Sequence, residues 1–83
     1  KELTMAMPLV LPHGNLITPA LIRGVVKFKG KGVALRNEFN KIQDFIPETD
    51  ARRQQVIVDC LLRVMSKRDW DQPDWEAEFA TAP

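Results

Sequence analysis

The side chains best suited to chemistry are few and widely separated in this chain of 83 residues. Its single histidine, His13, follows a proline in a His13-Gly14-Asn15 turn, and its single cysteine, Cys60, lies in an apolar stretch. A metal site needs several converging ligands, and a nucleophilic thiol needs a basic neighbour that lowers its pKa. We therefore expect His13 to be an exposed turn residue, Cys60 to be a small buried hydrophobic residue, and no metal to be bound.

Carboxylates gather near the C-terminus, in a segment that contains Asp69, Asp71, Asp74, Glu76 and Glu78. Acid catalysis by a carboxyl group at neutral pH requires a pKa that burial has raised, and a terminal segment rarely provides such burial. We expect these residues to form a solvated surface. The sequence thus predicts a protein that is not an enzyme, with no catalytic residue, no cofactor and no small-molecule substrate.

A basic loop, Lys27-Phe28-Lys29-Gly30-Lys31-Gly32, offers a different chemistry, which is the binding of phosphate. Lysines beside flexible glycines can bring ammonium groups and bare backbone amides against a phosphate group. The following segment is expected to be a helix whose exposed Arg and Asn side chains suit guanine and adenine edges in a major groove. The sequence therefore predicts a helix-turn-helix-like regulatory or accessory protein that binds nucleic acid. The predicted nucleic-acid site comprises Lys27, Lys29, Lys31, Arg36, Asn37, Asn40 and Lys41.

Charge is divided unevenly between the two halves of the chain. Residues 1–41 hold seven basic and two acidic residues (7 − 2 = +5), whereas residues 42–83 hold five basic and nine acidic residues (5 − 9 = −4). Such a field steers an anionic partner to one face of a protein and repels it from another. One hypothesis is that the acidic tail folds over the basic loop and competes there with an anionic ligand.

Hydrophobic periodicity indicates an all-α fold. Thr18 and Pro19 are typical of a helix start, and a first helix is expected from there to Phe28, although a strand at Val25–Phe28 is an alternative. Glycines at the basic loop end that helix. A second helix is expected over residues 33–45, where Leu35, Phe39, Ile42 and Ile46 repeat at helical spacing.

Two further helices follow Pro47. A third, central helix is expected to be capped by Thr49 or Asp50 and to run to about Lys67 or Arg68. A short fourth helix, with acidic residues in its first turn, is expected from Pro73 through Phe79. The predicted architecture is a small orthogonal bundle of three helices plus a short C-terminal helix, with an extended N-terminal arm.

The prolines Pro8 and Pro12 indicate that residues 1–17 form this arm, before a helical domain at 18–80 and a frayed tail at 81–83. The apolar run Met5–Leu11 could dock on the core or on a second chain. It could also pair with Leu16-Ile17 as a hairpin. Because the first residue is Lys, we expect the sequence to be a piece of a longer protein, and its beginning lacks the pattern of a signal peptide.

Protein–protein contact is the alternative function. An adaptor or oligomerisation domain would use the acidic and aromatic C-terminal segment together with the apolar arm, and would bind a protein partner or form a homo-oligomer. The residues in question are Leu9, Leu11, Trp70, Trp75 and Phe79. For the two tryptophans we favour packing over the core, because so small a domain needs them to cover the central helix.

The composition indicates a cytoplasmic protein without membrane contact. A lone cysteine cannot form an internal disulfide and suits a reducing compartment. Moreover, no apolar run in the sequence is long enough to cross a bilayer.

Overall fold

The computed structural model describes residues 8–67 and 69–81, and its fold is mixed α and β. A hairpin of β1 (Leu9–Val10) and β2 (Leu16–Ile17) comes first, followed by the short 3-10 helix η1 (Pro19–Leu21). Then come β3 (Gly24–Phe28), β4 (Gly32–Arg36), β5 (Ile42–Pro47), α2 (Ala51–Met65) and α3 (Trp75–Ala80). The prediction of an all-α bundle is therefore wrong, and so is the helix-turn-helix interpretation that depended on it.

The predicted second helix is replaced by β4, a loop and β5. Of the four residues at helical spacing, Leu35 and Ile46 are buried, but Phe39 and Ile42 are 72% and 52% exposed. The cause is the loop, where the side chain of Asn37 accepts hydrogen bonds from the backbone N–H groups of Phe39 and Lys41 at 2.9 and 3.1 Å. Asparagine favours such turns over helix interiors. The helical spacing was thus a coincidence across two strands.

The predicted first helix is also wrong beyond its opening turn. The Thr18-Pro19 start produces only η1, and the chain then enters β3. Consecutive β-branched residues at Val25 and Val26 favour a strand over a helix. The alternative of a strand at Val25–Phe28 is therefore confirmed, as is the hairpin between Leu9-Val10 and Leu16-Ile17.

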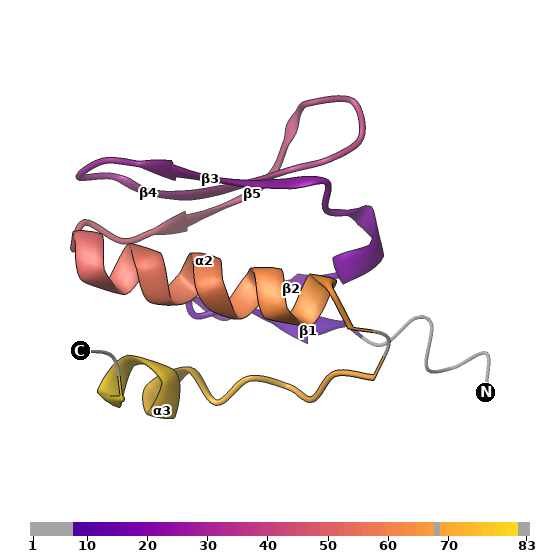
Figure 1. Ribbon diagram of the computed structural model, residues 1–83. Helices are drawn as coiled ribbons and strands as arrows, with labels where there is room; N and C mark the ends of the chain where they lie inside the picture. The colour runs from indigo at the N-terminus through magenta and orange to yellow at the C-terminus, as the bar shows by residue number, and fades with distance from the viewer. Residues whose placement is uncertain (1–7, 68, 82–83) are drawn as a thin grey trace.

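Strands β3, β4 and β5 form an antiparallel meander with β4 in the centre. Val33 pairs with Ile46, and Val25 with Leu35, so these side chains share the face that packs on α2. The opposite face, here called the outer face, carries Val26, Phe28, Gly32, Ala34, Arg36, Phe45 and Pro47. In Figure 1 the sheet lies above α2, the hairpin lies beside α2, and α3 lies below it, so no element covers the outer face.

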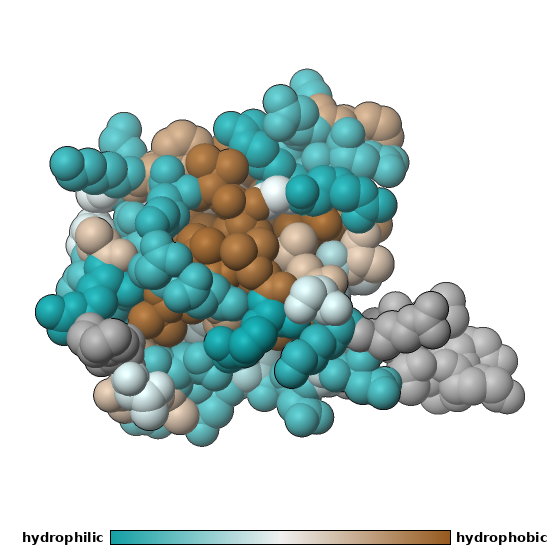
Figure 2. Space-filling model, in the orientation of Figure 1, coloured by the Kyte–Doolittle hydropathy of each residue, from teal (hydrophilic) through white to brown (hydrophobic). Residues whose placement is uncertain are grey.

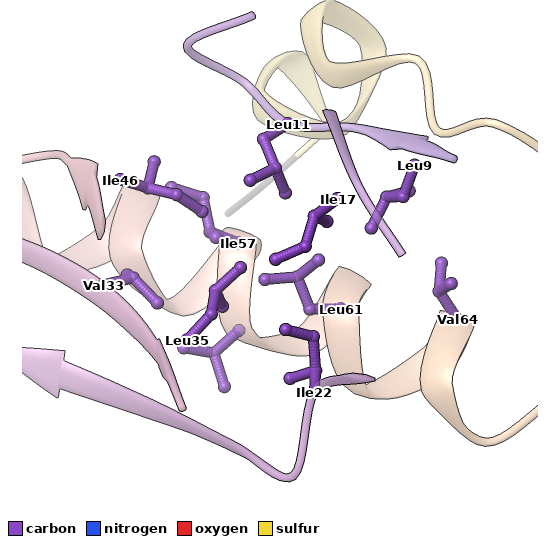
Figure 3. Packing of buried hydrophobic residues seen from close by; sticks show 11 residues of the cluster. Leu9, Leu11, Ile17, Ile22, Val33, Leu35, Ile46, Ile57, Leu61 and Val64 are labelled. Atoms are coloured by element: carbon purple, nitrogen blue, oxygen red, sulfur yellow. The ribbon is translucent and has the colours of Figure 1, made fainter. Parts of the chain in front are cut away.

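Helix α2 is the predicted central helix. The carboxylate of Asp50 caps it by accepting hydrogen bonds from Arg52 N at 2.8 Å and Arg53 N at 3.5 Å, which confirms Asp50 as the cap. The helix ends at Met65, slightly before the predicted end; Arg68 lies outside the described residues. Its buried face meets the sheet on one side and the hairpin on the other, as Figure 3 shows around Ile57 and Leu61.

The N-terminal segment is part of the core and not a separate arm. Leu9, Leu11 and Ile17 are buried in the same cluster as the residues of α2 and the sheet (Figure 3). The expectations for residues 1–7 and 82–83 lie outside the described residues. The predicted fourth helix is confirmed as α3, with the side chain of Asp74 accepting from Ala77 N at 3.2 Å.

The tail and the hairpin are held together by polar contacts. The indole N–H of Trp75 donates to the backbone carbonyl of Val10 at 2.6 Å, and Gln72 bonds the backbone on both sides of Leu9. Apolar surface reaches solvent between β3 and α2 on the face seen in Figure 2. No helix among the described residues is long and apolar enough to cross a membrane.

One buried polar side chain, Gln54, joins α2 to the sheet. It is 2% exposed, and its amide nitrogen donates to the carbonyls of Phe28 at 3.0 Å and Glu48 at 2.6 Å. Lys31 completes the network, because its N–H donates to the same Phe28 carbonyl and its own carbonyl accepts from Glu48 N. Gln54 therefore fixes the end of the sheet that carries the basic loop.

We predict that Gln54→Met lowers the free energy of unfolding by about 1–3 kcal/mol, because the buried carbonyl of Glu48 loses its donor while the side-chain volume changes little. Chemical denaturation followed by circular dichroism measures the change. Gln55→Met is the matched control at the neighbouring exposed position, where we expect a change within about 0.5 kcal/mol. Equal stabilities of the two variants would show that the Gln54 contacts do not hold the sheet.

Candidate nucleic-acid interface on the outer face of the sheet

The seven residues of the predicted nucleic-acid site do not gather at one place. Lys29 and Lys31 lie in the exposed turn between β3 and β4, whereas Arg36, Asn37, Asn40 and Lys41 lie at the opposite end of the sheet. A strand rises about 3.3 Å per residue, so the four steps from Gly32 to Arg36 separate the two groups by about 13 Å. Lys27 belongs to neither group, because it faces α2 and its ammonium donates to Gln55.

The turn that contains Lys29 and Lys31 is well defined. The N–H of Lys31 donates to the carbonyl of Phe28 at 2.9 Å, and Gly30 has a φ of 73°, a conformation that glycine adopts without steric cost. Neither lysine is paired with a carboxylate among the described residues. Glu48, the acid nearest in the backbone network, is bound instead to Arg53 at 2.9 Å. The turn therefore presents two positive charges to solvent.

Beside this turn, two aromatic rings lie on the outer face. The ring centroids of Phe28 and Phe45 are 6.3 Å apart with an interplanar angle of 47°. Both rings come from edge strands and meet across the central strand at Gly32, where a Cβ atom would lie 2.7 Å from the Phe45 ring. Phe45 is 37% exposed. A Cβ atom there would also overlap the backbone oxygen of Ile46, so both the pairing with β5 and the position of the Phe45 ring require glycine.

At the far end, the loop of residues 37–41 rises above the outer face (Figure 1). Its conformation is held by Asn37, whose side chain also donates to Gln43 at 3.2 Å, and by Asn40, which has a φ of 60°. The guanidinium of Arg36 donates to the carbonyl of Asn40 at 3.1 Å. Phe39 projects from this loop. The outer face is thus bounded by a lysine turn at one end and by a basic loop with an exposed aromatic ring at the other.

Sequence reasoning missed the exposure of Phe39 and Phe45 and the half-buried position of Phe28 on the outer face, because helical spacing assigned Phe28 and Phe39 to apolar faces and placed Phe45 beside them. The usable signal was their alternation with small residues: Gly32 and Ala34 on β4 lie opposite Phe28 and Phe45. Such alternation at period two is typical of a strand with a defined face.

The residues predicted for partner contact are used within the chain. Leu9 and Leu11 are buried, and Trp70, Trp75 and Phe79 are partly buried against the same core. The packing of both tryptophans over the core is confirmed. Phe79 also lies against the guanidinium of Arg53, 3.8 Å from its ring centroid. None of these five side chains offers the broad exposed surface that an adaptor needs.

The single histidine and the single cysteine lie in different parts of the fold, the hairpin turn and α2. His13 Nε2 lies 3.4 Å from Asp44 Oδ1, and Asn15 donates to the same carboxylate, so the group ties the hairpin turn to β5. The side chains of His13 and Asp44 are about one fifth exposed, so the expected exposed turn histidine is partly covered. Within residues 8–67 and 69–81, no three His, Cys, Asp or Glu side chains come together as metal ligands.

The acidic tail lies away from the basic loop. Figure 1 places the tail and α3 on one side of α2 and the sheet on the other. Glu78 of α3 is bound to Arg63 of α2 at 2.9 Å. The hypothesis that the tail folds over the basic loop is therefore wrong for this arrangement, and the uneven charge of the sequence becomes a difference between two sides of the molecule.

Cys60 is buried at 1% exposure, as expected, and burial raises its pKa to about 11, with Glu78 adding to the effect. We predict that iodoacetamide alkylates Cys60 of the folded protein at pH 8 at least about 100-fold more slowly than in the unfolded chain. A pKa raised by about two units lowers the thiolate fraction by that factor, and burial slows access further. Mass spectrometry measures both rates, and equal rates would show that the thiol is open to solvent.

Comparisons with known proteins do not identify the chain. No protein-family model matches it, and searches of curated proteins and of solved structures gave no significant match.

Proposed function

We propose that this chain binds single-stranded nucleic acid on the outer face of the sheet, as a small accessory protein without catalytic activity. The observation that carries the proposal is the ring pair of Phe28 and Phe45 beside the turn that presents Lys29 and Lys31. Exposed aromatic rings on a sheet stack unpaired bases, and nearby lysines neutralise the phosphates of the same strand.

A single strand suits this surface better than a duplex. The helix expected to read a major groove is absent, because residues 33–45 form a strand, a loop and a second strand. The bases of a duplex are stacked on one another and cannot reach Phe45, whereas those of a single strand can. Base stacking is also tolerant of sequence, so we expect little sequence preference.

Charge complementarity supports the same ligand. The uncovered side of the sheet is bordered by Lys29, Lys31, Arg36 and Lys41, with Glu38 as the acid of the 37–41 loop. The acidic residues of the tail lie across α2, where they do not repel a polyanion at the sheet. Long-range attraction then orients the ligand toward the outer face.

The adaptor alternative has less support, because its five aromatic and aliphatic residues are committed to the core of this chain. We also propose that the protein is cytoplasmic. A free buried thiol suits a reducing compartment.

We predict that the full chain binds a fluorescent oligouridine RNA with an affinity that falls steeply as salt rises, because phosphate contacts release counterions. Replacing both Lys29 and Lys31 by Gln should reduce the slope of log K against log salt by about 1.4, or about 0.7 for each lysine. Fluorescence anisotropy measures the slope. Lys67→Gln removes one positive charge just after the end of α2, and we expect it to leave the slope unchanged, whereas Lys29→Gln alone should lower the slope by about 0.7.

We predict that Phe45→Leu weakens RNA binding by roughly 5- to 150-fold, the equivalent of about 1–3 kcal/mol, without changing the salt slope. Leucine keeps the apolar bulk but removes the stacking ring. Phe79→Leu is the matched control on the opposite side of α2. Absence of RNA binding by the wild type at low salt would overturn the proposal. A dimer in sedimentation that Phe45→Leu dissociates would assign the outer face to self-association instead.

A further inference from the structure

We propose that Arg23 and Arg36 form a phosphate-binding site at the end of the sheet opposite the lysine turn. As a contact for a nucleic-acid strand, this site rests on the proposed function; as an anion site, it stands on its own geometry. The two arginines line a shallow cavity of about 250 Å³ that is open to solvent, together with Gly24, Asn37, Glu38 and Asn40.

The two arginines are brought together by the sheet itself. Gly24 pairs with Arg36 in the β3–β4 register, and the N–H of Arg23 donates to the carbonyl of Arg36 at 2.8 Å. Their positions are therefore fixed by backbone hydrogen bonds at the start of β3 and the end of β4. Both residues line the same cavity, and two guanidinium groups in one cavity repel each other less when an anion lies between them.

Each guanidinium is oriented by a backbone carbonyl. Arg23 donates from one terminal nitrogen to Ala20 O at 2.6 Å, and Arg36 donates from the corresponding nitrogen to Asn40 O at 3.1 Å. A guanidinium has five N–H donors, so each arginine keeps others for a ligand. Neither is paired with a carboxylate in the part of the chain that the structure describes. Oriented guanidinium groups suit the oxygens of a phosphate better than lysines do.

The surroundings leave room for the ligand. At Gly24, an added Cβ would meet no atom within 4 Å, so the floor of the cavity is open above the strand. The loop beside the cavity is held by the hydrogen bonds of Asn37 and does not need to rearrange. Glu38 is the one carboxylate in the lining and opposes an anion. Its removal should therefore strengthen phosphate binding.

The position of this site defines how a strand would lie. The lysine turn is about 13 Å away along β4, with Phe28 and Phe45 nearer the lysine end. If phosphates bind at the lysine turn and at the two arginines, and bases stack on the rings between them, the nucleic acid would run roughly parallel to β4. A ligand that spans both sites should bind more tightly than one that reaches a single site, because the second contact is intramolecular.

Inorganic phosphate tests the site without any nucleic acid. We expect the backbone amide resonances of Arg36 and Asn40 to shift saturably in NMR spectra as phosphate is added at constant ionic strength. Arg36→Gln should weaken phosphate binding roughly tenfold, and Glu38→Gln should strengthen it about two- to fivefold. Arg52→Gln on the exposed surface of α2 is the matched control and should leave it unchanged. Identical shifts with phosphate and with chloride, or no effect of Arg36→Gln, would overturn the proposal.

Oligouridine binding separates this proposal from the proposed function. If both are correct, Arg23→Gln with Arg36→Gln lowers the salt slope by about 1.4, as the two lysine substitutions do. RNA binding that is unaffected by these arginine substitutions would contradict the strand contact and leave the proposed function intact. Phosphate binding without any RNA binding would support the anion site and contradict the proposed function.

Discussion

The side-chain amide of Gln54 connects α2, the end of β3 and the segment after β5, which together position the outer face of the sheet. From inside α2 it donates to the last carbonyl of β3, at Phe28, and to the carbonyl of Glu48 just after β5. Because both acceptors belong to the sheet end that carries the lysine turn, the helix and the turn are fixed relative to each other. Burial of one polar group is acceptable here because its two donors are satisfied. Helix α2 packs on one face of the sheet, and no element of the described residues covers the other face.

The position of α2 explains both why the outer face of the sheet is uncovered and why the acidic tail lies away from it. Helix α2 lies between the sheet and α3, so the basic residues of β3, β4 and their loops lie across α2 from the acidic tail (Figure 1). Trp75 and Gln72 hold the tail against the hairpin and keep it from reaching the sheet. The uneven charge of the sequence thus gives the folded molecule a basic side and an acidic side. The rings of Phe28 and Phe45 lie on the basic side.

The sequence was informative where local chemistry decides the structure. The Asp50 cap, the existence of α2, the short α3 and the burial of Cys60 all follow from residues close in sequence, although α2 is amphipathic and leaves Leu62 half exposed. Sequence reasoning failed at residues 33–45, because Leu35 and Ile46 have helical spacing by coincidence and only the pairing with β3 decides between the alternatives. The candidate site was missed for the same reason: Phe28 and Phe45 are far apart in sequence and meet only across Gly32 in the folded sheet. Sequence reasoning identified the basic residues as candidates. It could not show that they lie at two opposite ends of the sheet, because that follows from the antiparallel pairing of β3, β4 and β5.

The central claim is that a nucleic-acid strand lies on the outer face, and photochemical cross-linking to RNA followed by mass spectrometry tests it most directly. With an oligouridine that carries a photoreactive thiouridine, the account predicts cross-links within β3, β5 or the loop at residues 37–41, at aromatic residues such as Phe45 and Phe39. Cross-links confined to α2, α3 or the hairpin would contradict it.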